Sequence, residues 1–247
     1  GVALLYRTTR RLTLTREGEA LVVSARRMLD AAESALGDLR EKAEQPSGEL
    51  RMTLPSVLSQ SRMIDDVAAF AAGHPRIEIR LDFSDLRRNL VDDGLDLAIR
   101  MSPKRKRASN RRSLFQVGRR LVASPAYLHG RQPITQPADL DACAWIELGQ
   151  TRTLRLTLRR ADGATALAKP RARIAANDAI AVYRLARAGA GVAVTPDFLA
   201  AEDVAAGRMR VLLPDWSLDG LDVFAEWPAN GPKGALAGRL VDALARG

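Results

Sequence analysis

The chain has 247 residues, 47% hydrophobic and 27% charged, which is typical of a globular protein with one large or two smaller domains. It has no apolar run long enough for a membrane helix and no start resembling a signal peptide, and its one cysteine, Cys143, cannot form an internal disulfide; we therefore expect a cytoplasmic protein. The net charge of +9 suits a partner that carries phosphates, although six of the positive charges lie in residues 103–112. With two histidines and one cysteine, we expect no structural metal site and no cofactor.

The first elements are a short strand and a long helix. Residues 10–15 alternate polar and apolar side chains, the pattern of a strand or β-ribbon. Thr15 is placed to cap a helix, and Glu17 and Glu19 suit the positive end of its dipole. The helix is expected over residues 15–44, before a Pro-Ser-Gly linker breaks it.

This helix carries a narrow apolar stripe. Its apolar residues recur at spacings of three and four, and the larger of them are Leu21, Met28, Leu36 and Leu39. Such a stripe on so long a helix is typical of a dimerisation seam. The alternative is an amphipathic helix that packs on its own domain.

After the linker, strands alternate with helical segments. We expect strands over 50–54, 77–83 and 95–99, a helix that begins near Ser56 and ends near Gly73, and a short helix over 86–91. Further strands are expected over 114–123 (interrupted by Gly118), 145–148, 154–158, 171–175, 192–194, 211–213 and 221–227, with helices over 124–128, 177–189 and 234–246. This alternation predicts an α/β protein with a parallel sheet.

Five strings in this order resemble the LysR-type transcriptional regulators. Residues 1–15 are similar to the wing and helix start that follow the recognition helix of that family. The others are the third-strand string 94–100, the Ala-Ser-Pro-Ala-Tyr-Leu string 123–128, the glycine turn and strand 188–196, and residues 206–216. The resemblance spans the whole chain.

The resemblance implies a two-subdomain, periplasmic-binding-protein-like (type 2) effector domain preceded by a long dimerisation helix. Residues 1–14 would be the remnant wing of a winged helix-turn-helix of which most is missing, 15–44 the linker helix, and 45–247 the effector-binding domain. Subdomain I would comprise 49–123 and 221–247, and subdomain II 124–220, with the chain crossing near Ser124 and returning near Leu221.

Ligands of open α/β sheets bind at the carboxyl ends of the strands. In this chain the corresponding candidates are Ser56, Val57, Met101, Ser102, Asn177 and Thr195. Ser56 begins a helical segment and could help to hold a carboxylate, whereas the simpler interpretation makes Ser56 and Asn177 helix caps. Leu58 is bulkier than the small residue usual in the family. The expected effector is a small molecule, such as an organic or aromatic acid.

The resemblance also implies DNA as a partner and assembly into a homodimer or homotetramer. Wing contacts to phosphates would come from Arg7, Thr8, Thr9, Arg10 and Arg11. The basic loop 103–112 departs from the family. It is either a solvated loop or a second site for phosphates or acidic ligands.

The alternatives to a DNA-binding regulator are an enzyme, the solute-binding protein of a transporter and a regulator that lacks its DNA-reading domain. An enzyme is disfavoured because the chain has no phosphate-binding glycine loop with its lysine, no HExxH and no GxSxG motif. A solute-binding protein of a transporter would share the two-lobed fold but would not need the N-terminal helix. A third alternative is a natural regulator that lacks its helix-turn-helix and acts by forming mixed dimers.

Overall fold

A hairpin and a long helix form the N-terminal part of the structure, a computed structural model that describes residues 2–7, 12–41, 46–103, 110–149, 155–228 and 235–246. Strands β1 (Leu5–Arg7) and β2 (Leu12–Leu14) pair antiparallel and lead into helix α1 (Arg16–Glu41). The expected strand and long helix are thus both present, and the predicted helix end at residue 44 lies outside the described residues.

Thr15 defines the start of α1, as the sequence predicts. Its buried hydroxyl accepts a hydrogen bond from the Gly18 amide at 2.9 Å and donates one to the Ala3 carbonyl at 2.8 Å. A Cβ atom on Gly18 would lie only 2.0 Å from the carbonyl oxygen of Leu4. A glycine therefore lets the hairpin segment pack closely against the first turn of the helix.

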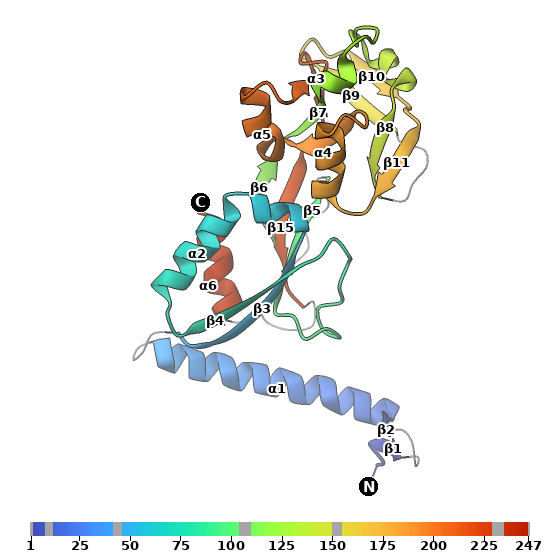
Figure 1. Cartoon of the computed structure of the whole chain (residues 1–247). Helices are drawn as coiled ribbons and strands as arrows, with labels where there is room; N and C mark the ends of the chain where they lie inside the picture. Colours follow the sequence, from blue (N-terminus) through green and yellow to red (C-terminus); the bar gives the residue numbers. More distant parts are fainter. Residues whose placement is uncertain are drawn as a thin grey trace.

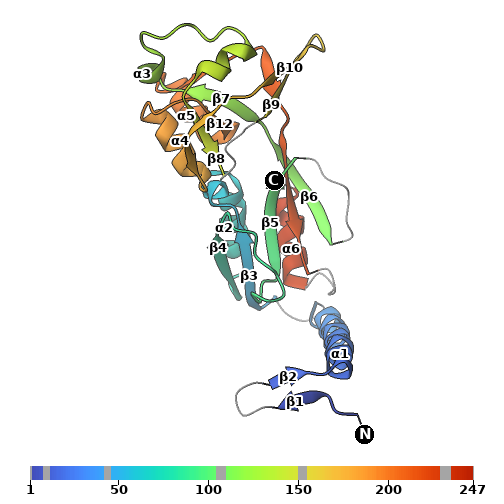
Figure 2. The same ribbon diagram turned by 90° about the vertical axis from the view of Figure 1, so that its right-hand side faces the viewer.

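Helix α1 lies apart from the α/β body as a separate rod (Figures 1 and 2). Leu21 and Met28 of this stripe are 49% and 74% exposed. At these positions the apolar stripe is uncovered within a single chain, which argues against packing of this face on its own domain. The side chains of Leu36 and Leu39 lie outside the described part of the structure.

The first part of the α/β body, here called lobe I, is built on a five-stranded sheet. Its order is β4-β3-β5-β15-β6. The strands are β3 (Gly48–Leu54), β4 (Ile77–Phe83), β5 (Leu97–Ser102), β6 (Arg111–Val117) and β15 (Leu221–Glu226). Strand β3 runs parallel to β4 and β5, but β15 runs antiparallel to β5 and β6. The sheet is mixed because β15 re-enters from the opposite direction.

Helices α2 (Met63–Gly73) and α6 (Ala235–Leu244) pack together on this sheet. Their buried side chains close one apolar core with those of β3 and β5. The predicted helix near Ser56 is split, because a 3₁₀ turn, η1 (Ser56–Gln60), precedes α2.

The short helix expected over residues 86–91 is wrong, since this segment forms turns. The Asn89 side chain accepts a hydrogen bond from the Val91 amide at 3.1 Å. Such local side-chain bonds offer the backbone an alternative to a helix. Gly94, at φ +63°, then turns the chain toward β5.

The second part, lobe II, contains three small sheets with the orders β12-β7-β13, β11-β8 and β10-β9-β14. The strands are β7 (Arg119–Ala123), β8 (Trp145–Leu148), β9 (Leu156–Arg160), β10 (Thr165–Ala168), β11 (Ala172–Ala176), β12 (Ala193–Pro196), β13 (Arg210–Val211) and β14 (Trp216–Leu218). The helical segments are α3 (Pro125–Leu128), η2 (Pro137–Ala142), α4 (Ala179–Arg187) and α5 (Asp197–Ala205). Strands β10 and β14 and helix α5 were not among the expected elements.

The chain crosses from lobe I to lobe II at Gly118. The sequence predicts this crossing six residues later, near Ser124. Strand β6 before it pairs with β15, whereas β7 after it pairs with β12 and β13. The chain returns to lobe I after β14, and Leu221 of β15 pairs with Val117 of β6. The two connecting strands therefore lie side by side at the hinge (Figure 1).

A buried carboxylate ties α5 to α4 in lobe II. Asp203 is only 8% exposed and accepts a hydrogen bond from the Tyr183 hydroxyl. It also forms ion pairs with Arg187, at 2.9 Å, and with Arg208. The hydrogen bond from Tyr183, together with the two arginines, holds the pKa of Asp203 below its ordinary value.

We expect Asp203→Asn to lower the free energy of unfolding at neutral pH by about 2 kcal/mol, because it neutralises a buried carboxylate and so removes its ion pairs with two arginines. A depressed carboxyl pKa stabilises the fold above the unfolded-state pKa of about 4, and this contribution is lost as the pH falls through the folded-state value. The difference between wild type and variant in urea unfolding should therefore shrink below about pH 4. Glu202→Gln is the control, since Glu202 pairs with the same Arg208 but is 93% exposed; a similar loss there would contradict the argument.

Candidate functional site

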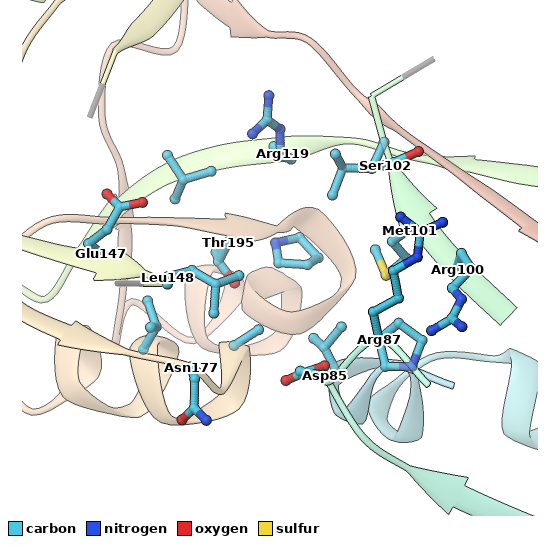
Figure 3. Close-up of a pocket in the computed structure, with 18 of the residues that line it drawn as sticks. Asp85, Arg87, Arg100, Met101, Ser102, Arg119, Glu147, Leu148, Asn177 and Thr195 are labelled. Carbon is cyan, nitrogen blue, oxygen red and sulfur yellow. The ribbon is translucent and has the colours of Figure 1, made fainter. Parts of the chain in front are cut away.

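A cavity of about 620 Å³ lies between the lobes, where the strands of both end (Figure 3). A volume of this size suits a small organic molecule. Five of the six residues predicted from the strand ends line it: Val57, Met101, Ser102, Asn177 and Thr195. The structure thus brings together side chains from β5, β12 and the loops after β3 and β11.

Ser56, the sixth predicted residue, is not part of the cavity lining and is engaged elsewhere. Its amide donates to Asp85 Oδ1 at 3.0 Å, and its hydroxyl lies 2.8 Å from Asp85 Oδ2 and 3.0 Å from Asp178 Oδ2. A hydroxyl has one proton, so it can donate to only one of these carboxylates at a time. Ser56 thus links the loop after β4 in lobe I to the start of α4 in lobe II.

Asp178, rather than Asn177, caps helix α4. Its Oδ1 accepts a hydrogen bond from the Ala181 amide at 2.6 Å. This leaves the side chain of Asn177 at the cavity, as Figure 3 shows. The simpler interpretation of Asn177 as a helix cap is therefore wrong.

Two hydroxyl groups on the cavity wall are buried without a hydrogen-bond partner among the described residues. They belong to Ser102 and Thr195, and Thr195 is only 1% exposed. An unsatisfied buried polar group costs about 1–3 kcal/mol. A ligand or a water that supplies the missing partner would recover that energy.

A cluster of charges lies on the lobe I side of the cavity. Arg111 Nη2 lies 2.7 Å from Glu226 Oε1, while Arg100 Nε lies 3.6 Å from Glu226 Oε2, too far for a hydrogen bond. Burial lowers the pKa of Arg100, but a guanidinium titrates so far above neutral pH that it remains charged. The Glu226 carboxylate is therefore shared by the guanidinium groups of Arg100 and Arg111, and the three residues together carry a net positive charge.

Two further charged residues at the cavity, Arg119 and Glu147, were missed by sequence reasoning. Arg119 begins β7 beside the hinge, and its Nε donates to the Asp219 carbonyl at 2.7 Å. Glu147 lies in β8 and accepts a hydrogen bond from Trp145 Nε1 at 3.1 Å. Burial lowers the pKa of the Arg119 guanidinium and raises the pKa of the Glu147 carboxyl. The sequence feature that could have identified Glu147 is its position as the one acidic residue in the otherwise apolar predicted strand 145–148.

The structure places the predicted DNA contacts only in part. Arg7 ends β1, whereas Thr8, Thr9, Arg10 and Arg11 lie outside the described residues, as do residues 104–109 of the basic loop. The last two arginines of that loop belong to β6. Arg111 lines the cavity and Arg112 pairs with Asp242 of α6. Within the described ranges, no three His, Cys, Asp or Glu side chains are grouped as metal ligands, and no helix could span a membrane.

Comparison with known proteins gives consistent matches over nearly the whole chain. A family model described as the LysR substrate binding domain matches residues 43–247. The HTH-type transcriptional regulator PtxR of Pseudomonas aeruginosa is 38% identical over 229 residues, which cover 93% of this chain and 73% of that protein. The HTH-type transcriptional activator AaeR of Escherichia coli is 27% identical, with 91% and 72% covered.

Solved structures of two regulators share the fold. The full-length Vibrio cholerae virulence activator AphB is 26% identical, with a TM-score of 0.69, and the match covers 98% of this chain and 83% of that one. CrgA from Neisseria meningitidis is 25% identical, with a TM-score of 0.67 and 98% and 84% covered. These relatives are transcription regulators and not enzymes. The chain belongs to the LysR family of transcriptional regulators, which bind DNA and effectors, and it carries the family's effector-binding domain.

Proposed function

We propose that this regulator senses a small organic acid in the cavity between lobes I and II. The observation that carries the proposal is the pair of buried hydroxyls of Ser102 and Thr195, which find no partner among the described residues, in a cavity where guanidinium groups outnumber carboxylates. The lining includes four arginines, Arg87, Arg100, Arg111 and Arg119, and three acidic residues, Asp85, Glu147 and Glu226. An anion with hydrogen-bond acceptors would satisfy both features.

Binding would act on transcription by shifting a population between lobe arrangements. A ligand favours one arrangement only if it binds that arrangement more tightly. Ser56 is placed to respond, since its hydroxyl faces carboxylates from both lobes. Val57, Met101 and Asn177 would contact the ligand from their positions on the cavity wall.

The remaining parts of the chain would connect this sensor to DNA. In this proposal residues 1–14 act as a wing, residues 15–44 as a dimerising linker helix, and residues 45–247 as the effector domain. Arg7, Thr8, Thr9, Arg10 and Arg11 would contact phosphates. The regulator would work in the cytoplasm as a homodimer or homotetramer, with the stripe of Leu21, Met28, Leu36 and Leu39 between two copies of α1.

The test is a thermal-shift and calorimetric screen of the chain against small carboxylic acids, each paired with its amide. An acid at a hundred times its dissociation constant should add about 2.7 kcal/mol of stability. Thr195→Val should weaken binding about 5- to 30-fold, because the ligand loses a hydrogen bond worth about 1–2 kcal/mol. The unliganded variant should be as stable as wild type or more so, because an unsatisfied hydroxyl is removed.

Ser217→Ala is the matched control, because that hydroxyl is in lobe II but donates to the Arg159 carbonyl away from the cavity. Its effector affinity should equal that of wild type. A panel in which acids and amides shift the melting temperature equally would contradict the acid-sensor proposal. Unchanged affinity in Thr195→Val would remove its hydroxyl from the site.

A further inference from the structure

The cavity contains a second unmatched group, of opposite sign to the arginines. Glu147 is only 8% exposed, and its one hydrogen-bond partner among the described residues is the indole N–H of Trp145, which binds Oε2. Among the described residues no donor is hydrogen-bonded to its other carboxylate oxygen, Oε1, and Glu147 lines the cavity. A buried carboxylate normally has a cation or several donors around it.

Arg119 does not supply that partner. Both residues line the same cavity, but among the described residues neither forms an ion pair with the other or with a third side chain. Figure 3 shows their side chains rising from different strands of the cavity wall. The cavity thus offers a cationic group and an acidic group at separate places. No described residue forms an ion pair with either, although Asp219 acts on Arg119 electrostatically.

The wall of the same cavity also carries apolar side chains. The aliphatic ones include Leu148, Leu156, Val194 and Leu221. Water held against such side chains is readily displaced by an apolar ligand body. A ligand with polar ends and an apolar middle would therefore match the wall better than a compact anion.

We infer that the effector is bipolar: its acidic group lies with Arg119, Ser102 and Thr195, and a hydrogen-bond donor at its other end is bound by Glu147. This inference rests on the proposed function, since it specifies which small acids the cavity accepts. The donor is a hydroxyl or an ammonium group. Glu147 is then the residue that selects acids carrying such a donor over acids that lack one.

The test uses matched acids that differ only at the far end. Hexanoate is compared with its ω-hydroxy and ω-amino derivatives, and benzoate with its para-hydroxy and para-aminomethyl derivatives. Within at least one set, wild type should bind a donor-bearing acid about tenfold or more tightly than the plain acid. Glu147→Gln should abolish or greatly reduce the preference for an ammonium-bearing acid while leaving the affinity for the plain acid unchanged.

The same variant separates the two donors. The glutamine of this variant keeps its carbonyl oxygen on the Trp145 indole and turns its NH₂ group to the ligand, where a hydroxyl can accept, so a hydroxy acid should lose little affinity. It cannot neutralise an ammonium group, so an amino acid-like ligand should lose most of its advantage. Burial raises the pKa of Glu147 and a bound ammonium group would lower it again, so the proton release that calorimetry in two buffers detects on binding should grow as the pH is lowered toward that pKa.

Glu202→Gln, on the exposed face of α5 in lobe II, is the control and should preserve the wild-type preference. If plain acids bind as tightly as the substituted ones, and Glu147→Gln changes nothing, the bipolar inference is wrong while the acid-sensor proposal stands. If no acid of any kind binds, both are wrong.

Discussion

Gly191→Ala is expected to destabilise lobe II by about 3 kcal/mol, the largest loss of fold stability that we predict from one methyl group. A Cβ atom at this position would lie 2.3 Å from the carbonyl oxygen of Ala144 and 3.3 Å from Ile146 Cγ1. That carbonyl accepts a hydrogen bond from the Val192 amide at 2.8 Å. The clash is with backbone, so it can be relieved only by separating two segments that are bonded to each other.

The surroundings of Gly191 make such a separation costly. Ile146 donates its amide to the Val192 carbonyl at 2.9 Å, and Trp145 and Val192 form a parallel bridge between β8 and the segment before β12. Trp145, Ile146 and Val192 are all at most 1% exposed. Moving either segment would therefore disturb both buried backbone bonds and the packing of lobe II.

Chemical denaturation of wild type and two alanine variants measures the effect. Gly73→Ala is the matched control, because Gly73 ends α2 with nothing within 4 Å of the added Cβ. It should change stability by less than about 0.5 kcal/mol or raise it slightly, as alanine restricts the unfolded chain. A midpoint for Gly191→Ala within error of that control would show that the close approach of the two segments is not required.

Local patterns in the sequence were sufficient for most elements of the fold. The alternation of Leu50, Met52 and Leu54 predicts β3, and the strand over 77–83 has the bounds of β4. Thr15 was recognisable as a cap, and it accepts a hydrogen bond from the Gly18 amide three residues on. These features depend on neighbours within one turn or one strand, which is the range over which sequence patterns are informative.

Only those residues of the cavity that lie at the carboxyl ends of strands could be predicted from the sequence. Strand ends of an α/β sheet meet at one edge, so Val57, Ser102 and Thr195 could be proposed without knowing their contacts. Ser56 shows the limit of that rule. Its partners are 29 and 122 residues away, in Asp85 and Asp178, and nothing near Ser56 indicates that they occupy its hydroxyl.

The charged residues of the cavity were missed for a related reason. Arg100 and Arg111 share Glu226 because β15 returns from lobe II and lies between β5 and β6. That insertion joins segments more than a hundred residues apart, so no short window contains it. Glu147 and Arg119 likewise come together at the cavity from two different sheets. Glu147 lies in β8 of the sheet β11-β8, and Arg119 lies in β7 of the sheet β12-β7-β13.

Met28→Glu is expected to raise the dimer dissociation constant of this chain by on the order of a thousandfold, equivalent to about 4 kcal/mol. Met28 is 74% exposed on α1 in a single chain, in line with Leu21 along the helix. In a symmetric dimer the substitution enters the seam twice, so two apolar contacts are lost and two carboxylates must be buried or displaced. Folding of the monomer should be unaffected, because few of the chain's own contacts cover this face.

Sedimentation velocity over a range of protein concentrations measures the change, with thermal unfolding recorded alongside. Val23→Glu is the matched control, since it places the same charge at a 46% exposed apolar position on the opposite side of α1. If α1 is the dimerisation element, Met28→Glu yields monomers at concentrations where wild type and Val23→Glu remain dimers. If all three proteins show the same assembly, the seam of Leu21 and Met28 does not hold the subunits together, and the contacts between copies must lie on the lobes.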